Sequence, residues 1–315
     1  MRRTAIAIHG GAGTLLKAEM SPTKEKAYLA ALEVALKAGH EVLKNDGTSL
    51  DAVEIAVRSM EDSPLFNAGK GSVFTADGTH EMDASIMNGK GRSAGAVCGI
   101  TGVKNPIHLA RKVMEETEHV MLAGRGAEEF ARGIGMDFMP PEYFHDALRH
   151  AQWMSVRGTD TIALDHDIDP EKKLGTVGAV AIDINGNLAA ATSTGGMTNK
   201  KFGRIGDSPI IGSGTYANNA TCAVSCTGSG EFFIRGVVAY EVSALMEFKG
   251  LSLKEACETV IKDRLIQIGG DGGLIAVDRS GNLCLIFNTA GMYRGQVNSS
   301  GEMSLGIYGE ESAKA

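Results

Sequence analysis

The chain has 315 residues, of which 43% are hydrophobic and 22% are charged, which is enough apolar material for a large core. Its net charge of −7 and the lack of any lysine- and arginine-rich block exclude a broad nucleic-acid-binding surface. No stretch approaches the ~18 consecutive apolar residues that a membrane-spanning helix needs.

The chain begins with two arginines and a short apolar run, Ala5 to Ile8. This run is too short for the hydrophobic region of a signal peptide, so we predict a first β-strand here. Five cysteines are odd in number and form no C-x-x-C pair. We expect them to be reduced and mostly buried, as in a cytoplasmic protein, at positions 98, 222, 226, 257 and 284.

Two amphipathic helices are predicted next. The first covers residues 22–44, where apolar residues recur at helical spacing behind a capping Ser21 and an initial Pro22. The second begins after Thr48, which can cap it, and ends at Pro64.

Short elements and a connector follow. Glycine-rich turns between short apolar runs predict strands within residues 66–103, and helices are predicted near 106–116 and 124–134. Residues 137–175 are polar and without a stable period, so they are predicted to form an irregular, exposed connector.

No convincing metal-binding motif is present. The segment DHDIDP (165–170) resembles a calcium loop, but Pro170 stands where glycine is needed and no glutamate occupies the twelfth position. A solvated acidic turn is the better prediction. The eight histidines are scattered singly and form no H-E-x-x-H motif, so a structural or exposed position is expected for each.

Two hairpins are predicted in the second half of the chain. Residues 176–197 place two apolar runs around Asn185-Gly186, a strong hairpin signal, and residues 273–292 repeat the pattern at an offset of 95. Convergence on one turn and internal duplication both explain the repeat. Capped helices lie between the hairpins, and this order predicts an α+β sandwich rather than a parallel doubly wound sheet.

Two glycine-rich segments could present backbone N–H groups to an anion. They are HGGAG (9–13), after the first strand, and TGSGEFF (227–233), before a helix. A merely tight turn explains the first equally well. Nucleotide binding is not indicated, because neither G-x-x-x-x-G-K-[ST] nor G-x-G-x-x-G with a downstream acid occurs.

The Gly175-Thr176 junction is the strongest chemical feature. No G-x-S-x-G motif supplies a serine nucleophile, and a threonine hydroxyl becomes nucleophilic when its own α-amine acts as the base. That chemistry requires cleavage before Thr176, and Gly175 can adopt the strained backbone that this needs. The residues alone leave self-cleavage and ordinary strand propensity both open. Thr192 is expected to be a packing residue.

Several motifs together identify a family. IHGGAG, PLFNAGKGSVFT, GTVGAVAIDINGNLAAATSTGGMTNK, GRIGDSPIIGSGTYANN and SCTGSGE occur in this order, and the resemblance that they carry runs from about residue 5 to 295. The chain thereby resembles the plant-type L-asparaginase/isoaspartyl aminopeptidase family of N-terminal nucleophile hydrolases. The resemblance implies an αββα sandwich, a single domain whose working form is a dimer of αβ units, and hydrolysis of L-asparagine and β-aspartyl dipeptides to release L-aspartate.

The resemblance also implies the reacting groups. Cleavage between Gly175 and Thr176 would give an α chain (1–175) and a β chain (176–315), with Thr176 as the nucleophile and its amine as the base. Thr194 would hold the nucleophile and pass protons. The oxyanion hole and a supporting side chain would be supplied by Thr227, Gly228 and Asn67.

Substrate-binding and metal-binding residues follow from the same resemblance. Arg204 would bind the substrate α-carboxylate and Asp207 its α-ammonium. Gly230 and Gly11 would let the backbone approach the ligand. No cofactor is implied for catalysis, but a structural sodium would be bound by backbone carbonyls of Met60, Glu61, Ser63, Phe66, Ala68 and Lys70.

Two rival functions fit less well. A glycosylasparaginase shares the Gly-Thr nucleophile, but the absence of a signal peptide and of a disulfide framework disfavours it. A non-catalytic, glycine-rich small-molecule-binding protein would leave the grouping of Thr176, Thr194, Thr227, Arg204 and Asp207 as coincidence.

Overall fold

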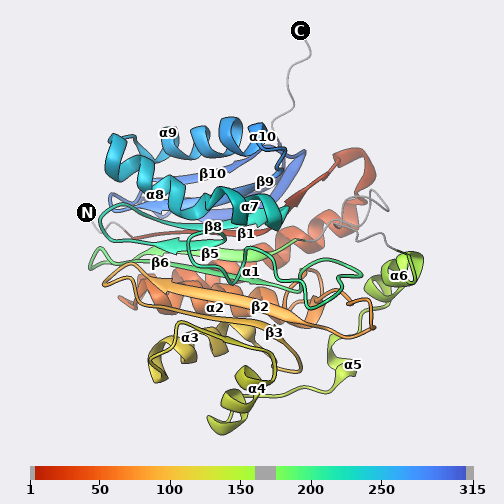
Figure 1. The fold of residues 1–315 in the computed structure, drawn as a ribbon. Coiled ribbons are helices and arrows are strands. Elements are labelled where there is room, and N and C mark those ends of the chain that lie inside the picture. The colour runs from red at the N-terminus through yellow and green to blue at the C-terminus, as the bar shows by residue number, and fades with distance from the viewer. Residues whose placement is uncertain (1–3, 160–174, 310–315) are drawn as a thin grey trace.

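The computed structural model describes residues 4–159 and 175–309, and Figure 1 shows two stacked β-sheets between helices. The larger sheet has eight strands in the order β12-β11-β1-β5-β6-β2-β3-β4. In chain order these strands are β1 (Ala5–Gly13), β2 (Met82–Asn88), β3 (Ala94–Ile100), β4 (Met121–Ala123), β5 (Val177–Ile182), β6 (Leu188–Thr194), β11 (Gly291–Val297) and β12 (Met303–Tyr308).

The smaller sheet has four strands in the order β10-β9-β8-β7. They are β7 (Thr215–Ala217), β8 (Cys222–Gly228), β9 (Gly272–Asp278) and β10 (Leu283–Phe287). Every strand pair in the two sheets is antiparallel except β3 with β4. The predicted mixed, hairpin-based fold is therefore confirmed, and a doubly wound parallel sheet is excluded.

Helices cover the outer face of each sheet. On the larger sheet these are α1 (Pro22–Lys44), α2 (Ser49–Glu61), α3 (Pro106–Glu116) and α4 (Gly124–Gly133). On the smaller sheet these are α8 (Val238–Lys249), α9 (Leu253–Glu258) and the π-helical turn η3 (Thr259–Arg264), with α7 (Gly230–Gly236) and α10 (Leu265–Gln267) beside them. The inner faces of the sheets pack through β1, β5 and β6 against β8 and β9.

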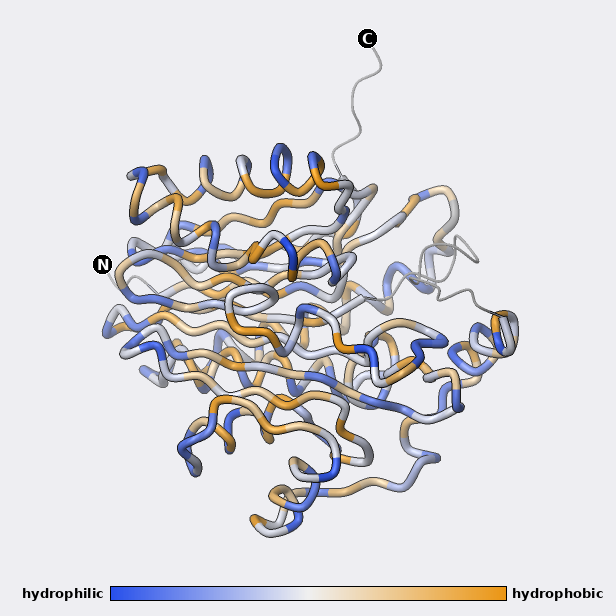
Figure 2. The backbone as a smooth tube through the Cα atoms, viewed as in Figure 1, coloured by the Kyte–Doolittle hydropathy of each residue, from blue (hydrophilic) through white to orange (hydrophobic). Residues whose placement is uncertain are grey.

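Two apolar cores hold these layers together. One lies between the first helices and the larger sheet, and the other lies between the sheets and under α8 and α9. Figure 2 shows hydrophobic residues running along the strands of both sheets. No helix in the described residues is both long and apolar enough to cross a membrane.

Most predicted helices and both hairpins are confirmed. The predicted helix 22–44 coincides with α1, and Ser21 caps it by accepting from the N–H of Lys24. The two hairpins share one turn chemistry as well as a sequence pattern. In the first, Asp183 accepts from the N–H groups two and four residues later, and Asp278 does the same in the second.

Two sequence predictions are wrong. The segment 9–13 is not a loop, because β1 continues to Gly13 with a register shift between His9 and Ala12. The connector 137–175 is not irregular throughout, because Pro141 begins α5 (Pro141–Phe144) and Asp146 caps α6 (Ala147–Val156). The predicted acidic turn at 165–170 lies outside the described residues.

The five cysteines agree with the sequence prediction. All are free, and only Cys284 is more than slightly exposed. Burial raises the pKa of the Cys222 thiol to about 12, so this thiol stays protonated and unreactive at neutral pH.

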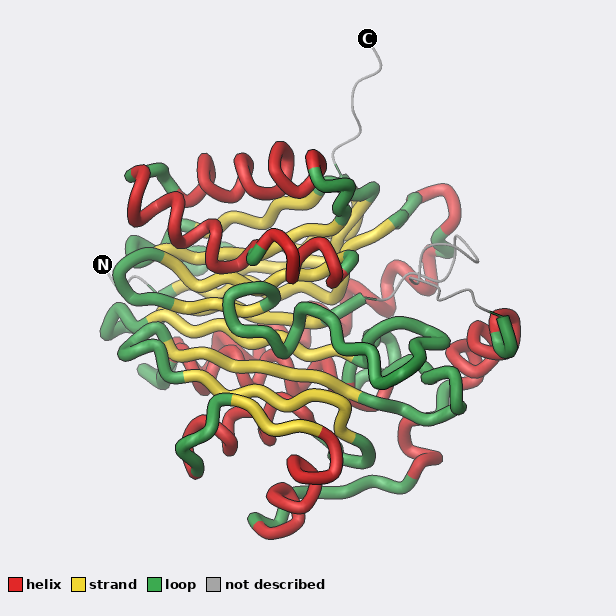
Figure 3. Tube along the Cα trace, viewed as in Figure 1, coloured by secondary structure: helices red, strands yellow, loops and turns green. Residues whose placement is uncertain are grey.

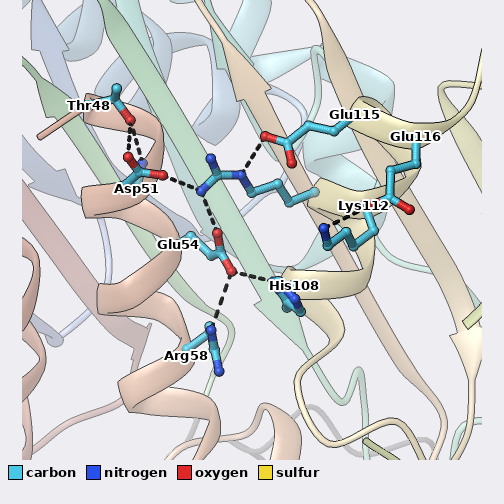
Figure 4. Close-up of polar contacts among 9 residues, drawn as sticks. Thr48, Asp51, Glu54, Arg58, His108, Lys112, Glu115 and Glu116 are labelled. Atoms are coloured by element: carbon cyan, nitrogen blue, oxygen red, sulfur yellow. Dashed lines mark hydrogen bonds and ion pairs between the residues drawn. The ribbon is translucent and has the colours of Figure 1, made fainter. Parts of the chain in front are cut away.

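An ion-pair network fixes α3 against α2 below the larger sheet (Figure 4). Arg111 contacts Asp51 at 2.6 Å, Glu54 at 2.6 Å and Glu115 at 2.8 Å. The Nδ1 atom of His108 lies 2.6 Å from Glu54. Burial by itself would raise the pKa of Glu54, but His108 and Arg111 together lower it, so this buried carboxylate stays ionised and paired.

Candidate active site

Thr176 lies at the centre of the larger sheet, immediately before β5. That strand is paired with β1 on one side and β6 on the other, so its first residues are fixed from both directions. The side chain is 8% exposed. The Thr176 hydroxyl is therefore placed next to a strand held on both sides, at the margin of a pocket.

The Thr176 hydroxyl lies beside two others. Its Oγ1 atom donates to Oγ1 of Thr194 at 3.1 Å, and Oγ of Ser208 lies at 3.5 Å. Thr194 is the last residue of β6, the neighbouring strand, and its Oγ1 also accepts from the N–H of Gly196 at 3.0 Å. Ser208 was not singled out from the sequence, although it directly follows Asp207 in the GRIGDSP motif.

Asn67 fixes the turn that follows Thr194. Its side-chain Nδ2 donates to the carbonyl of Gly196 at 2.7 Å, and its main-chain carbonyl accepts from the N–H of Gly195 at 3.0 Å. A Cβ on Gly195 would lie 2.4 Å from Oδ1 of Asn67, so only glycine fits there. The structure thus places Asn67 beside the site through Gly195 and Gly196, with no direct contact to Thr176 among its hydrogen bonds.

Thr227 and Gly228, at the end of β8, face the junction before Thr176. Oγ1 of Thr227 is buried and makes no hydrogen bond within the described residues. It lies 3.2 Å from the position that a Cβ on Gly175 would occupy. A Cβ on Gly11 would lie 2.5 Å from the nitrogen of Gly175. Glycines at 11 and 175 therefore bring two backbones together next to an unsatisfied hydroxyl.

Arg204 is hydrogen-bonded to Glu231, which the sequence prediction missed. Its Nε and Nη2 atoms donate to the two carboxylate oxygens of Glu231 at 2.8 and 2.9 Å. A guanidinium has a second pair of donors, on Nη1 and Nη2, for another carboxylate. Glu231 therefore orients Arg204 without using all of its donors. The signal was present, because Glu231 stands in the TGSGEFF motif.

The carboxyl group of Asp207 is buried. Its Oδ2 atom makes no hydrogen bond within the described residues, and burial raises its pKa to about 7. A Cβ on Gly230 would lie 2.9 Å from Oδ1 of Asp207 and 3.0 Å from Nη2 of Arg204. Gly230 thus gives these two side chains room, and a cation of the right size would satisfy Asp207.

The predicted sodium loop is compatible with carbonyl ligands. A Cβ on Gly69 would lie 2.5 Å from the Glu61 carbonyl oxygen, so glycine allows this oxygen to approach the loop. Loop N–H groups donate to carbonyls of Met60, Phe66 and Ala68, and each carbonyl keeps a second lone pair. Nζ of Lys70 lies 5.2 Å from the centre of the Tyr143 ring, so its charge has a partner outside the loop. Ser63 lies in the same turn.

One pocket collects most of the predicted residues. The long loop between β6 and β7, drawn in green in Figure 3, contributes Arg204 and Asp207 to it. Gly230 lies against the pocket residues rather than in its lining. The predicted sodium ligands do not line this pocket, but Asn67 of the same loop does. The lining residues are Ala12, Asn67, Gly175, Thr176, Thr194, Gly196, Met197, Arg204, Gly206, Asp207, Ser208, Thr227 and Gly228.

A family profile described as asparaginase matches residues 2–307. The chain therefore belongs to the asparaginase family. It is 52% identical to the isoaspartyl peptidase of Escherichia coli (strain K12) over 314 residues, covering 99% of this chain and 98% of that protein. It is 45% identical to the plant-type L-asparaginase of Pyrococcus abyssi (strain GE5 / Orsay), covering 91% of this chain and 94% of that protein.

Proposed function

We propose that this chain is an autocleaving threonine hydrolase that acts on β-aspartyl (isoaspartyl) dipeptides and L-asparagine and releases L-aspartate. One observation carries the proposal. The buried Thr176 hydroxyl, which donates a hydrogen bond to Thr194, lies in one pocket with the unsatisfied hydroxyl of Thr227. Arg204 and Asp207 line the same pocket. The full-length similarity to proteins named isoaspartyl peptidase and plant-type L-asparaginase supports the same substrates.

The first step in this proposal is cleavage of the chain before Thr176. Oγ1 of Thr176 attacks the carbonyl carbon of Gly175, the peptide C–N bond breaks, and the hydroxyl proton passes to the departing nitrogen, which becomes the free amine of Thr176. Water then hydrolyses the ester between Gly175 and Oγ1, which releases the Gly175 carboxylate and restores the Thr176 hydroxyl. The hydroxyl of Thr227 lies beside Gly175, so we assign it as the donor to the oxygen of this carbonyl as charge develops on it. The products are residues 1–175 and residues 176–315.

Turnover then uses the new amine. The Thr176 amine takes the proton of Oγ1, Oγ1 attacks the side-chain amide or isopeptide carbonyl carbon, and the C–N bond breaks. Ammonia or the second amino acid of the dipeptide then leaves with the proton held by the amine. Water then releases L-aspartate. Thr227 and the N–H of Gly228 stabilise the oxyanion, and removing one such donor typically raises the barrier by about 3 kcal/mol. Arg204 binds the α-carboxylate and Asp207 the α-ammonium of the aspartyl group.

The wider assignments belong to the same proposal. The two sheets and their outer helices would form the αββα sandwich of N-terminal nucleophile hydrolases. A sodium ion held by the carbonyls of the 60–70 loop would fix the segment that carries Asn67. The working form would be a cytoplasmic dimer of αβ units.

Denaturing electrophoresis tests the proposal most directly. We expect two bands of about 18 and 15 kDa, scaled by residue count, because the nucleophile is generated by the cut. Thr176→Ala should stay uncut and inactive. Thr221→Ala, which changes a buried threonine outside the pocket, should behave as wild type. A wild-type chain that remains whole while hydrolysing β-Asp-Leu would exclude the mechanism.

A comparison of substrates distinguishes the proposed function from that of a glycosylasparaginase. Steady-state kinetics with β-Asp-Leu, L-asparagine and aspartylglucosamine should show turnover of the first two. Turnover of aspartylglucosamine alone would support a glycosylasparaginase instead. Binding of these compounds without hydrolysis of any would support a binding protein.

A further inference from the structure

A continuous chain of buried polar side chains runs between the two sheets behind Thr176. It joins His9 of β1, Thr192 of β6 and Ser85 of β2 to Ser225 of β8 and Thr215 of β7. All five side chains are fully buried. Apolar packing is the usual content of such an interface, and burying hydroxyls is costly unless each is hydrogen-bonded.

The two ends of this hydrogen-bond network both reach Thr176. At one end, Nδ1 of His9 lies 3.0 Å from the carbonyl oxygen of Thr176. At the other end, Ser85 shares its single proton between Oγ1 of Thr215 at 2.8 Å and the carbonyl oxygen of Ser208 at 2.6 Å. The Ser208 hydroxyl is the one 3.5 Å from Oγ1 of Thr176. The network therefore contacts the main chain of Thr176 and reaches its side chain through Ser208.

The direction of the hydrogen bonds near Thr176 is fixed by elimination. A carbonyl only accepts, so Nδ1 of His9 carries a proton and donates to Thr176. Burial lowers the pKa of His9 to about 3, so the ring is neutral and its Nε2 atom is an acceptor. Ser225 must donate to Nε2 at 2.9 Å, and since this uses its only proton, Thr192 must donate to Ser225 at 2.7 Å. Each hydrogen bond therefore determines which group donates in the next one.

We propose that His9, Ser225 and Thr192 are positioning residues that anchor the main chain of Thr176 once it has become a chain terminus. This inference rests on the proposed function. Before the cut, Gly175 restrains Thr176 from the other side. After the cut that restraint is lost, and terminal residues fray unless they are tied down. The bond from His9 to the Thr176 carbonyl ties down the residue that carries both the attacking hydroxyl and the basic amine.

The test compares two buried serines in the processed enzyme. Ser225→Ala removes the donor to His9. Ser243→Ala is the matched control, since Ser243 is also fully buried and bonded to a single hydroxyl, that of Thr221, but is not part of the network. Because His9 loses the donor that fixes its ring, we expect kcat for β-Asp-Leu to fall about tenfold in Ser225→Ala only. KM should stay within about twofold, because Arg204 and Asp207 are untouched.

A second pair of variants guards against misfolding of Ser225→Ala. Thr192→Val keeps the shape of the side chain but cannot donate to Ser225, whereas Thr192→Ser can. We expect kcat to fall in the valine variant and to be restored in the serine variant. Autocleavage should slow less than turnover in Ser225→Ala and Thr192→Val, because the uncut chain still holds Thr176 through Gly175.

The outcomes separate this inference from the proposed function. An active, processed wild type with equal kcat in Ser225→Ala and Ser243→Ala, or in Thr192→Val and Thr192→Ser, overturns the inference alone. Parallel changes in KM and kcat also overturn it, because they indicate general distortion of the pocket. A wild type that neither cuts itself nor turns over substrate overturns both.

Discussion

Asp207 shows the conflict between stability and binding at the scale of one residue. Its carboxylate is removed from water and lacks a partner for Oδ2 within the described residues. Burial raises its pKa to about 7 from a model-compound value of 3.8, so ionising it in the folded, ligand-free protein is costly. A substrate ammonium would supply the missing charge, and the energy stored in the unpaired group would then favour binding.

We expect Asp207→Asn to be more stable than wild type at pH 8, although it should bind substrate poorly. The stability that the protonated carboxyl gives the fold is fully present below pH 3.8 and is lost as pH rises through about 7. The advantage of the variant should therefore shrink as pH falls from 7 towards 4. Urea denaturation at pH 8 and pH 5 measures this, with the exposed Asp77→Asn as control. An advantage that grows on acidification would contradict it.

Glu231 gives a second prediction at this scale, since it holds Arg204 by two bonds. Glu231→Gln should let the guanidinium move. Half-exposed ion pairs contribute up to about 1 kcal/mol, so KM should rise about fivefold with little change in kcat. Glu247→Gln, an exposed glutamate on α8, is the control. A lower KM would show instead that Glu231 competes with substrate for Arg204.

Single residues were predicted from the sequence where a short motif carried them. Arg204 and Asp207 stand three apart in one motif, and the pocket brings them near Thr176. His9, Ser225 and Thr192 were not predicted together, because they meet only when β1, β6 and β8 are stacked. Thr192 was expected to pack, and it is fully buried, but its hydroxyl contacts needed the structure.

At the scale of elements, periodicity and caps predicted helices and hairpins well. The helix α1 and the hairpin strands β5 and β6 follow from local signals, namely Ser21 with Pro22 and the Asn185-Gly186 turn. The strand β1 was predicted too short, since glycines normally weaken a strand. Pairing of Ala12 and Gly13 with β11 overrides that tendency, and β5 pairs with the first part of the strand, Ala5 to His9.

The ion-pair network between α2 and α3 makes a prediction for these elements. Arg111→Met should lower the free energy of unfolding by about 2–3 kcal/mol, because it leaves the buried Glu54 short of a partner. Arg125→Met should change it by less than about 0.5 kcal/mol, since the Arg125 pair with Glu129 is exposed. Chemical denaturation of both variants measures the difference. Equal losses would show that the network contributes no more than a surface pair.

At the scale of the whole molecule, the larger sheet alternates between the two halves of the chain. Strands β1, β2, β3 and β4 precede Gly175, and β5, β6, β11 and β12 follow it. In the sheet, β1 lies between β11 and β5, while β6 pairs with β2. The sequence predicted the class of fold and the hairpins. It could not predict this order, because pairing between distant strands depends on how all the layers pack.

This order predicts how the cut protein behaves. The fragments 1–175 and 176–315 should co-elute in size-exclusion chromatography without denaturant, because separating them would expose unpaired strand edges and both cores. They should also melt together. Uncut Thr176→Ala gives the reference elution volume. Fragments that separate under native conditions would contradict the observed strand order.

The strand order of the larger sheet also determines when the chain can fold during its synthesis. As the chain leaves the ribosome, β1 emerges early, yet its two neighbours in the sheet, β5 and β11, follow more than a hundred residues later. The first half therefore has no complete sheet to fold into until nearly the whole chain has been made. The pocket around Gly175 therefore forms late, because it also needs Thr227 and Gly228 from the second half of the chain. The peptide bond that the mature enzyme is proposed to lose is thus the link that keeps both halves together while they find each other.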